Sequence, residues 1–378
     1  KAQQKFLGQE RPEFYKNRVF QIFENIDLDR IPKKLDEPEG TLIEITNACN
    51  LDCMMCQTHL SARETGLMEP ELFERIVLES KAMGLPGAGL HTVGETFVYK
   101  DLGVLIEIAE RHNFPVWIST NAQFPERLKE LYSQFPNMIT NLRLSIDGAT
   151  RETFESIRRG ASFDKLIETC EVIYEINRKK KNYRIFTTIG ALLNSETVLE
   201  IPIYFQQFDK YVEPRDISFG LITGLALDDS YFKETFPFEN LIRHEAPCDY
   251  PFSNLHYTYD GKATVCCLDF NAELVIGDIK INSAKEIWDS PKAENLREQH
   301  INPETLKANH CKRCYGPYKF LNPLMNSYIQ FLRLKTSGSA QRAIGDKVLS
   351  LLKGMNDIMK TKDISSLRKY VLDSFDDN

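Results

Sequence analysis

From residue 41 onward, short apolar runs alternate with stretches of helical periodicity, and this alternation constrains the fold more than any other feature. Six runs are expected to be strands: 41–46, 89–92, 116–119, 142–146, 184–189 and 216–219. Helical patterns lie between these runs, at 71–83, 102–111, 125–134, 163–178 and 196–208. Strands and helices that alternate at this spacing form right-handed βαβ units around a parallel sheet. Because six units are too few for a closed eight-stranded barrel, the sequence predicts an α/β fold with an open, partial barrel.

The rest of the chain is arranged around this barrel segment. We divide it into an N-terminal extension, the barrel, a loop-like connector, a cysteine-bearing domain and a helical tail, at 1–40, 41–225, 226–247, 248–320 and 321–378. In the cysteine-bearing domain, Asp260-Gly261 separates two short β-prone runs, which predicts a hairpin. In the tail, a break is expected near 337–339, and Asp363 is expected to cap the last helix.

Composition limits the classes of function. The 378 residues are 42% hydrophobic and 27% charged, as in an ordinary globular protein. A net charge of −7 argues mildly against a main task of binding nucleic acid. No apolar run approaches the ~18 residues of a membrane span, and the polar start is unlike a signal peptide. We therefore expect a cytoplasmic protein without nucleic acid or membrane partners, in which clustered cysteines are metal ligands or catalytic groups.

The first cysteine cluster directly follows the first predicted strand. Cys49, Cys53 and Cys56 place three thiols within eight residues, on a loop at the carboxyl end of that strand. Such thiolates can converge on one soft metal centre. A zinc site would need a fourth protein ligand, for which His59 is close enough in sequence. A [4Fe–4S] cluster with three cysteines instead leaves one iron open to an external ligand. The polar surroundings make three unrelated buried cysteines the least favoured alternative.

The spacing C-x3-C-x2-C after the first strand of an α/β pattern resembles the radical S-adenosylmethionine (SAM) superfamily. The resemblance implies a TIM-like partial (β/α)6 barrel in which Cys49, Cys53 and Cys56 hold a [4Fe–4S] cluster. In that family the open iron binds the amino and carboxylate groups of SAM. An electron from the cluster then cleaves SAM to methionine and a 5′-deoxyadenosyl radical, which abstracts a hydrogen atom from the substrate. The resemblance also implies an electron donor such as flavodoxin or ferredoxin.

Further segments at the ends of the predicted strands carry the same resemblance. Gly94-Glu95 resembles part of the family's Gly-Gly-Glu-Pro segment, with Val93 and Thr96 in place of its first glycine and its proline. Without the resemblance, Glu95 would be interpreted as a solvated loop carboxylate. The segments 119–121 and 144–148 resemble the family's Thr-Asn-Gly and Ser-(Ile/Leu)-Asp-Gly stretches. By resemblance, the residues expected to contact or surround SAM are Met55, Gly94, Glu95, Ser119, Asn121, Ser145, Asp147 and Arg158.

A second set of four cysteines follows the barrel. Cys248, Cys266, Cys311 and Cys314 form the pattern C-x12-G-x4-C, followed later by C-x2-C. On spacing alone this pattern suits a structural zinc equally well. It resembles the SPASM/twitch extension of radical SAM proteins, which implies an auxiliary [4Fe–4S] cluster. No cysteine follows Cys314, so we expect one auxiliary cluster whose irons are all ligated and which accepts or relays an electron.

Two cysteines remain outside these sets. Cys170 falls in a helical pattern and is expected to be a buried structural thiol. Cys267 is adjacent to Cys266 and has two interpretations. It could donate a hydrogen atom to a substrate radical, as a cysteine does in some epimerases of the family. Alternatively, it is a small buried residue on the reverse face of a strand.

The resemblance leads to one main expectation of function and two alternatives. We expect the chain to abstract a hydrogen atom from a small hydroxylated substrate (a sugar, aminocyclitol or nucleoside), giving dehydrogenation or epimerisation. The main alternative is a peptide-modifying enzyme, which often carries a peptide-recognition domain of ~80 residues. Forty N-terminal residues are too few for such a domain. A non-catalytic zinc protein with two cysteine sites is the most remote alternative.

Overall fold

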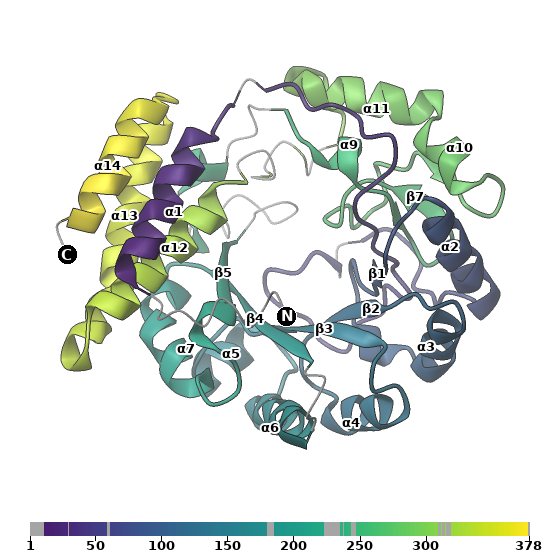
Figure 1. Cartoon of the computed structure of the whole chain (residues 1–378), viewed down its shortest axis with the longest axis horizontal. Coiled ribbons are helices and arrows are strands. Elements are labelled where there is room, and N and C mark those ends of the chain that lie inside the picture. Colours follow the sequence, from purple (N-terminus) through teal and green to yellow (C-terminus); the bar gives the residue numbers. More distant parts are fainter. Residues whose placement is uncertain are drawn as a thin grey trace.

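A computed structural model describes most of the chain; its elements form a ring, with the strands β1 to β5 on the inner side and helices outside them (Figure 1). The described residues are 11–28, 30–58, 61–179, 185–222, 235–236, 238–242, 247–308, 311, 314 and 319–376. The possible zinc ligand His59, the first residue of the expected strand 184–189 and most of the connector 226–247 lie outside these residues. In the described part of the chain, no helix is long and apolar enough to cross a membrane.

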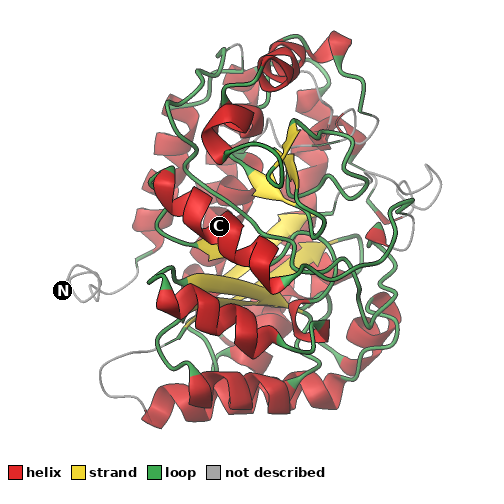
Figure 2. Ribbon diagram, turned by 90° about the vertical axis from the view of Figure 1, so that its right-hand side faces the viewer, coloured by secondary structure: helices red, strands yellow, loops and turns green. Residues whose placement is uncertain are grey.

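The core of the fold is a sheet of five parallel strands in the order β1-β2-β3-β4-β5. They are β1 (Ala88–Gly89), β2 (Val116–Thr120), β3 (Ile139–Ser145), β4 (Phe186–Leu193) and β5 (Ile217–Leu221). Along these strands, buried apolar residues alternate with residues that are less buried, because neighbouring side chains point to opposite faces. The parallel strands with helices outside confirm the predicted partial α/β barrel (Figure 2).

The predicted first strand, 41–46, is present as an extended segment rather than as a strand of the sheet. It forms isolated parallel bridges on both sides, from Leu42 to Gly89 and from Ile43 to Tyr257. The N–H of Ile43 donates to the carbonyl of Gly89 at 2.8 Å, and the N–H of Tyr257 donates to the carbonyl of Leu42 at 2.9 Å. The segment therefore joins the barrel sheet to the C-terminal hairpin, which is why the sheet has five strands instead of six.

Amphipathic helices cover the outer face of the sheet (Figure 1). They are α2 (Pro70–Ala82), α3 (Leu102–Arg111), α4 (Pro125–Gln134), α5 (Arg151–Ile157), α6 (Phe163–Lys179) and α7 (Ile201–Phe208). Proline in the first turn of α2, α4 and α7 suits a position where the backbone N–H has no helical partner. The five predicted helices are confirmed, although the pattern 196–208 begins as a 3-10 turn, η4 (Thr197–Glu200), before α7.

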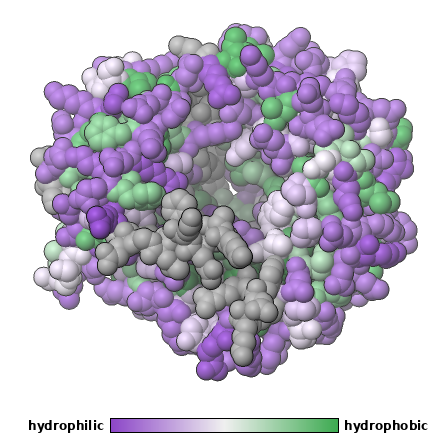
Figure 3. Space-filling model, in the orientation of Figure 1, coloured by the Kyte–Doolittle hydropathy of each residue, from purple (hydrophilic) through white to green (hydrophobic). Residues whose placement is uncertain are grey.

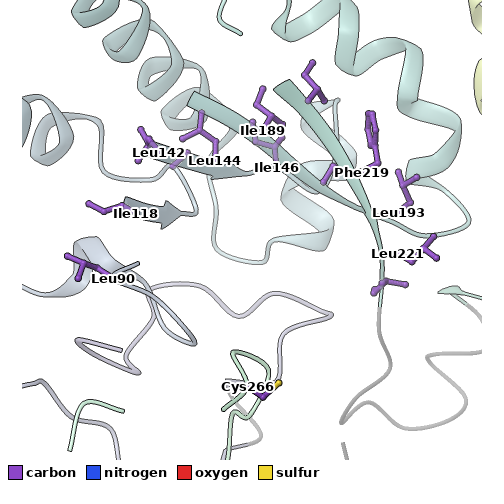
Figure 4. Packing of buried hydrophobic residues seen from close by; sticks show 14 of the residues in the cluster. Leu90, Ile118, Leu142, Leu144, Ile146, Ile189, Leu193, Phe219, Leu221 and Cys266 are labelled. Carbon is purple, nitrogen blue, oxygen red and sulfur yellow. The ribbon is translucent and has the colours of Figure 1, made fainter. Parts of the chain in front are cut away.

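Apolar side chains between the sheet and the helices form the core. Leu142, Leu144 and Ile189 are fully buried, with at most 1% of their surface exposed (Figure 4). Cys266 belongs to the same continuous cluster although it comes from the C-terminal region (Figure 4). The cysteine-bearing segment therefore packs on the barrel instead of forming a separate core.

The C-terminal cysteine-bearing segment contains a small antiparallel sheet and short helices. Its elements are α9 (Tyr250–Ser253), β6 (His256–Tyr257), β7 (Lys262–Thr264), β8 (Gly277–Asp278), α10 (Ala284–Trp288) and α11 (Pro291–Ile301). β6 and β7 are antiparallel, with His256 opposite Thr264, which confirms the predicted hairpin. Gly261 closes the turn with a φ of 86°, a conformation that glycine adopts without strain.

The helical tail packs against the N-terminal helix and the last strand (Figure 1). Its helices are α12 (Leu321–Lys335), α13 (Ile344–Met359) and α14 (Ile364–Asp376), beside α1 (Pro12–Glu24). The predicted break near 337–339 is confirmed, and the carboxylate of Asp363 accepts from the N–H of Ser366 at 3.0 Å as the predicted cap. The remaining short 3-10 helices are η3 (Thr96–Val98), η5 (Pro214–Asp216), η6 (Glu239–Ile242), η7 (Pro303–Thr305) and η9 (Gly338–Ala343).

Candidate active site

The first cysteine loop is held against the end of α5. The N–H of Asp52 donates to the carbonyl of Arg159 at 3.0 Å, and the N–H of Met54 donates to the carbonyl of Ile157 at 2.9 Å. Along the loop, Cys49 is exposed, Cys53 is buried and Cys56 is partly buried. One anchored loop thus presents all three predicted ligands.

Burial makes the Cys53 thiol resist ionisation in the metal-free protein. Desolvation raises the pKa of Cys53 to about 12, and the nearby Arg158 opposes this rise. Nη1 of Arg158 lies 4.0 Å from the Cys53 sulfur. A metal centre requires thiolates, and a buried thiolate needs positive charge close to it. Bound metal and the Arg158 guanidinium would together supply that charge.

Arg158 is fixed by a buried ion pair with Asp147. Its Nη2 donates to Oδ2 of Asp147 at 2.7 Å, and both side chains are at most one-tenth exposed. The other carboxylate oxygen of Asp147 accepts from the N–H of Leu192 at 2.7 Å. The pair joins the ends of β3 and β4 to the cysteine loop. The expected contacts of these two residues with SAM stay predictions.

Glu95 is buried, not solvated. Its Oε1 accepts from the N–H of Phe97 at 3.1 Å and from the hydroxyl of Thr120 at 2.8 Å. Its Oε2 accepts from the N–H of Asn121 at 2.7 Å. Burial raises the pKa of Glu95, and these three hydrogen bonds oppose the rise. The carboxylate therefore ties the end of β2 to the loop after β1, and Oε2 keeps room for another donor.

Gly94 allows this loop to approach the cysteine loop. Its φ is +80°, and a Cβ at this position would lie 2.6 Å from the carbonyl oxygen of Thr46 and 2.8 Å from that of Ala48. The N–H of Glu95 donates to the same carbonyl of Ala48 at 2.8 Å. Only glycine fits such a close backbone approach.

The other predicted SAM residues lie along the same edge of the sheet. The amide of Asn121 donates to Oδ1 of Asn50 at 2.8 Å, beside the cysteines. The hydroxyls of Ser119 and Ser145, on adjacent strands, are 3.4 Å apart. Met55 is partly buried and packs against the core. The structure thus brings the predicted residues to the carboxyl ends of β1 to β3 and the facing loop.

The loop after β3 is fixed by a buried tyrosine that sequence analysis did not single out. The hydroxyl of Tyr204 donates to the carbonyl of Ile146 at 2.9 Å and accepts from the N–H of Gly148 at 2.6 Å. These bonds hold the backbone on both sides of Asp147. In the sequence, Tyr204 is one tyrosine in an apolar helix, and nothing near it in the chain indicates that its hydroxyl binds the backbone of a distant loop.

The second set of cysteines also comes together. Cys248, Cys266, Cys311 and Cys314 are all buried and line one small pocket of about 20 Å³. Burial raises the pKa of Cys248 to about 12. The N–H of Leu268 donates to the sulfur of Cys266 at 3.4 Å, a contact that favours the thiolate. The pocket gathers the ligand set that the spacing predicts.

His300 also lines this pocket, and sequence analysis missed it. Its Nε2 lies 3.8 Å from the sulfur of Cys311, and its Nδ1 lies 2.8 Å from the carbonyl of Leu296. The side chain is 2% exposed. A histidine on the inner face of a helix resembles an ordinary core histidine, so the sequence carries no signal for its place beside the cysteines.

The two remaining cysteines differ from each other. Cys267 lies in a turn after β7 rather than within a strand, so the interpretation that places it on the reverse face of a strand is wrong, while the hydrogen-donor interpretation stays a prediction. A hydrogen bond between the two thiols lowers the pKa of Cys267 and raises that of Cys266. Cys170 is 1% exposed within α6, as a structural thiol should be.

A partly buried ion pair, also missed, connects the two cysteine regions. Arg63 forms a bidentate pair with Glu44, with its Nη1 at 3.1 Å from Oε2 and its Nη2 on Oε1. Glu44 also accepts from the hydroxyl of Thr92 at 2.8 Å and from the N–H of Tyr259 at 3.2 Å. The loop after the first cysteines is therefore held against the β6–β7 hairpin, which directly precedes Cys266.

Both cysteine sets fit iron–sulfur clusters. Among the described residues, no three His, Cys, Asp or Glu side chains lie close enough together to hold a single metal ion. A polynuclear cluster needs a wider arrangement, with one thiolate on each iron. Three thiols in the first set would leave one iron of a [4Fe–4S] cluster without a protein ligand, whereas four thiols in the second set would be enough for every iron of such a cluster.

Known proteins resemble this chain in sequence or in fold. The chain is 28% identical to the mycofactocin maturase MftC of Mycobacterium tuberculosis over an alignment of 146 residues. This alignment covers 38% of this chain and 36% of the maturase. The match thus spans about a third of that relative. SuiB of Streptococcus suis bound to precursor peptide SuiA aligns with a TM-score of 0.55 and 16% identity, over 74% of this chain and 76% of SuiB.

A second solved structure supports the same fold. Native anSMEcpe with bound AdoMet aligns with a TM-score of 0.54 and 16% identity, over 84% of this chain and 100% of that protein. The sequence matches the Radical SAM superfamily model over residues 43–201 and the model of the SPASM iron-sulfur cluster-binding domain over residues 248–315. These ranges contain all seven cysteines of the two sets. The chain therefore belongs to the radical SAM superfamily and carries a SPASM iron–sulfur cluster-binding domain.

Proposed function

We propose that this enzyme cleaves SAM and uses the resulting radical to remove a hydrogen atom from a substrate held inside the half-barrel. One observation carries the proposal: Cys49, Cys53 and Cys56 share one anchored loop that faces the Glu95 segment and the buried Arg158–Asp147 pair. A [4Fe–4S] cluster on these cysteines, with SAM on its open iron, would supply the electron that yields methionine and a 5′-deoxyadenosyl radical.

The chain's own residues have separate tasks in this proposal. Arg158 keeps a positive charge beside the thiolates, where Asp147 fixes its direction. Glu95 orients the backbone next to the cysteine loop, and its Oε2 is the candidate acceptor for the SAM ammonium group. Ser119 and Ser145 offer hydroxyls on the inner side of the sheet. Met55, Gly94 and Asn121 complete the proposed SAM surroundings.

Dehydrogenation is the reaction that we favour over epimerisation. In dehydrogenation, the substrate carbon loses a hydrogen atom and then an electron and a proton, so that a C–OH group becomes C=O. The second cysteine set would hold an auxiliary [4Fe–4S] cluster able to accept that electron. Epimerisation instead needs a hydrogen atom returned from a thiol, for which Cys267 is the candidate. The contact of Cys267 with Cys266 favours a role beside the auxiliary cluster.

Our proposed substrate class is a small hydroxylated molecule of the sugar, aminocyclitol or nucleoside type. A peptide is the second candidate, because MftC is named a maturase and SuiB was solved with a precursor peptide.

The first test is SAM cleavage by anaerobically reconstituted protein, with dithionite in place of a flavodoxin or ferredoxin donor. Wild-type protein is expected to form 5′-deoxyadenosine. Cys53→Ala should abolish its formation and lower the iron content, while Cys170→Ala, a buried cysteine outside both sets, should retain both. Reconstituted wild type that holds iron and sulfide but forms no 5′-deoxyadenosine would refute the proposal.

The second test identifies the substrate class and the reaction. Deuterated sugars, aminocyclitols, nucleosides and peptides are supplied one at a time, and deuterium in 5′-deoxyadenosine marks the substrate. Dehydrogenation predicts a carbonyl product and the same yield from Cys267→Ala. An epimer as product, lost in Cys267→Ala while SAM cleavage continues, would show that epimerisation is the reaction.

A further inference from the structure

His91 lies just after β1 and faces the inner side of the barrel sheet. Leu90, directly before it, is buried in the core between the sheet and the helices, and neighbouring side chains of an extended segment point to opposite faces. The N–H of Leu90 donates to the carbonyl of Trp117 at 2.9 Å, so the pairing with β2 continues past Gly89. The strands line the inner side of the ring of elements (Figure 1), and the space-filling view shows the molecule hollowed near its centre (Figure 3).

The register of the sheet places His91 in one row with a residue of the proposed SAM site. Gly89 is the partner of Trp117 across β1 and β2. Two residues further along each segment, His91 comes level with Ser119 on the same face of the sheet. A substrate that gives up a hydrogen atom to the SAM-derived radical lies next to SAM, and therefore near this row.

The other neighbour of β1 connects His91 with the hairpin beside the second cysteine set. Segment 41–46 forms a bridge to β1 on one side and to β6 on the other. His91 is also close enough to His256 on β6 to contribute to the low pKa of that histidine. A substrate in contact with His91 is thus placed between the first cysteine loop and the second cysteine set, which would receive its electron.

The imidazole of His91 is neutral, and its Nδ1 has no hydrogen-bond partner in the part of the chain that the structure describes. This nitrogen is buried, although the residue as a whole is partly exposed. Burial lowers the pKa of His91 to about 4, and the positive charge of Arg143 on β3 adds to this effect. At neutral pH one ring nitrogen therefore carries a lone pair that can accept a hydrogen bond or a proton.

Three buried carboxylates beside the two cysteine regions are already engaged. Glu44 and Asp147 each form an ion pair with an arginine, and Glu95 accepts three hydrogen bonds. Oxidation of a C–OH group to C=O releases a proton, which a positioned base within hydrogen-bond reach accepts most efficiently. Each of the three carboxylates would have to give up a partner in order to take that proton, whereas His91 would not.

We propose that His91 is a catalytic base, whose imidazole accepts a hydrogen bond from the reacting hydroxyl of the substrate and then takes the hydroxyl proton. The inference rests on the proposed function, and on dehydrogenation in particular. The SAM-derived radical removes the hydrogen atom from the carbon and becomes 5′-deoxyadenosine. The substrate radical then gives its O–H proton to His91 and one electron to the auxiliary cluster, so that C–OH becomes C=O. The site therefore requires a hydroxyl group on the carbon that loses the hydrogen atom.

The first test asks whether His91 is neutral and reachable, with diethyl pyrocarbonate as the probe. This reagent acylates unprotonated imidazole, and mass spectrometry of peptides from the anaerobically reconstituted holoenzyme locates the modified histidines. The rate at His91 should fall less than about twofold between pH 7 and pH 5, whereas a histidine with the ordinary pKa of about 6.5 would slow about 25-fold. A His91 that stays unmodified, or that slows like an ordinary histidine, overturns the proposal.

The second test separates hydrogen abstraction from oxidation. It uses the deuterated compounds of the substrate assay and measures the ratio of carbonyl product to deuterated 5′-deoxyadenosine. His91→Gln keeps a hydrogen-bonding side chain that cannot take a proton, so it should lower this ratio by at least about tenfold. His112→Gln is the matched control, because His112 lies at the end of α3, outside the barrel, and is bound to Glu74. It should leave the ratio unchanged.

The remaining outcomes also decide for or against the proposal. An unchanged ratio in His91→Gln overturns it while the proposed function stands. It is also overturned if His91→Gln weakens SAM binding, measured by equilibrium dialysis, as much as it lowers the ratio, because His91 would then belong to the SAM site. Should His91→Gln fail to fold, His91→Asn gives the same comparison. Wild type that forms no 5′-deoxyadenosine refutes the proposed function itself, and this inference with it, so the two failures are distinct.

Discussion

The side-chain amide of Asn326 binds both backbone groups of Phe219. Its Oδ1 accepts from the Phe219 N–H at 2.8 Å, and its Nδ2 donates to the Phe219 carbonyl at 2.6 Å. Phe219 lies on β5, the last strand of the open sheet, whose outer edge would otherwise lack partners. One turn earlier on α12, Asn322 accepts from the N–H of Leu221 at 3.3 Å. A helix with two asparagines thus takes the place of a sixth strand.

This arrangement predicts a graded loss of stability along α12. Asn326→Leu leaves a donor and an acceptor of β5 without partners and should lower the free energy of unfolding by about 2–6 kcal/mol, at about 1–3 kcal/mol for each buried unsatisfied group. Asn322→Leu, the matched variant whose bond to the Leu221 N–H is longer, should cost less. Chemical denaturation of the cluster-free proteins measures both. Equal losses in the two variants would contradict this account of the edge.

The Arg158–Asp147 pair predicts a strong coupling between two substitutions. Asp147 is 2% exposed, so Arg158→Met leaves a buried carboxylate without its cation and should destabilise the protein by about 3–5 kcal/mol. Asp147→Asn in the same chain removes that charge and should restore part of the loss. Thermal unfolding of the two single variants and the double variant measures the coupling. Additive effects would show that the pair is not an energetic unit.

His256 predicts a loss of stability in acid. Burial lowers the pKa of His256 to about 3, and its Nδ1 accepts from the N–H of Leu42 at 2.9 Å. Because the folded-state pKa is below the unfolded value of about 6.5, the neutral imidazole stabilises the fold above that pH. This contribution falls as the pH drops from about 6.5 toward 3, by about 1.4 kcal/mol for each pH unit.

His256→Asn checks this prediction, because its amide oxygen can accept from Leu42 but does not titrate. The free energy of unfolding of the cluster-free protein is measured between pH 7 and the lowest pH at which it folds. The variant should show a shallower decline than wild type. Identical slopes in the two proteins would mean that His256 is not the responsible group.

Gly94 predicts a selective effect on the first cluster. Gly94→Ala places a Cβ against the carbonyls of Thr46 and Ala48, directly before Cys49, and should displace the cysteine loop. Gly338→Ala is the matched control, because Gly338 also has a positive φ but has open space around it. Both variants bear the backbone cost of about 1–2 kcal/mol. Only Gly94→Ala should lose iron from the first cluster, measured by iron analysis and electron paramagnetic resonance (EPR). Equal iron content in both variants would contradict the prediction.

The sequence predicted the fold and the cysteine sets because their signals are local. Strand and helix periodicity, the hairpin turn at Asp260-Gly261 and the two cysteine spacings each depend on residues close together in the chain. The place of segment 41–46 between two sheets was not predictable in this way. It depends on pairing with Tyr257, more than two hundred residues later.

The other features of the structure that the sequence did not predict are polar contacts between residues far apart in the chain. Asn326 on Phe219, Arg63 on Glu44 and His300 beside Cys311 are pairs that no periodicity indicates. One of the two interpretations of Cys267 extended strand alternation into what is a turn.

The most direct test of the account asks whether SAM binds the iron that the three cysteines leave open. In a Cys248→Ala/Cys266→Ala variant, which lacks two of the auxiliary ligands, the first cluster is reduced and mixed with SAM labelled with ¹⁵N in its amino group. Electron–nuclear double resonance should then show a ¹⁵N coupling to the cluster, absent with unlabelled SAM. An intact reduced cluster that shows no such coupling at saturating SAM would contradict the central claim.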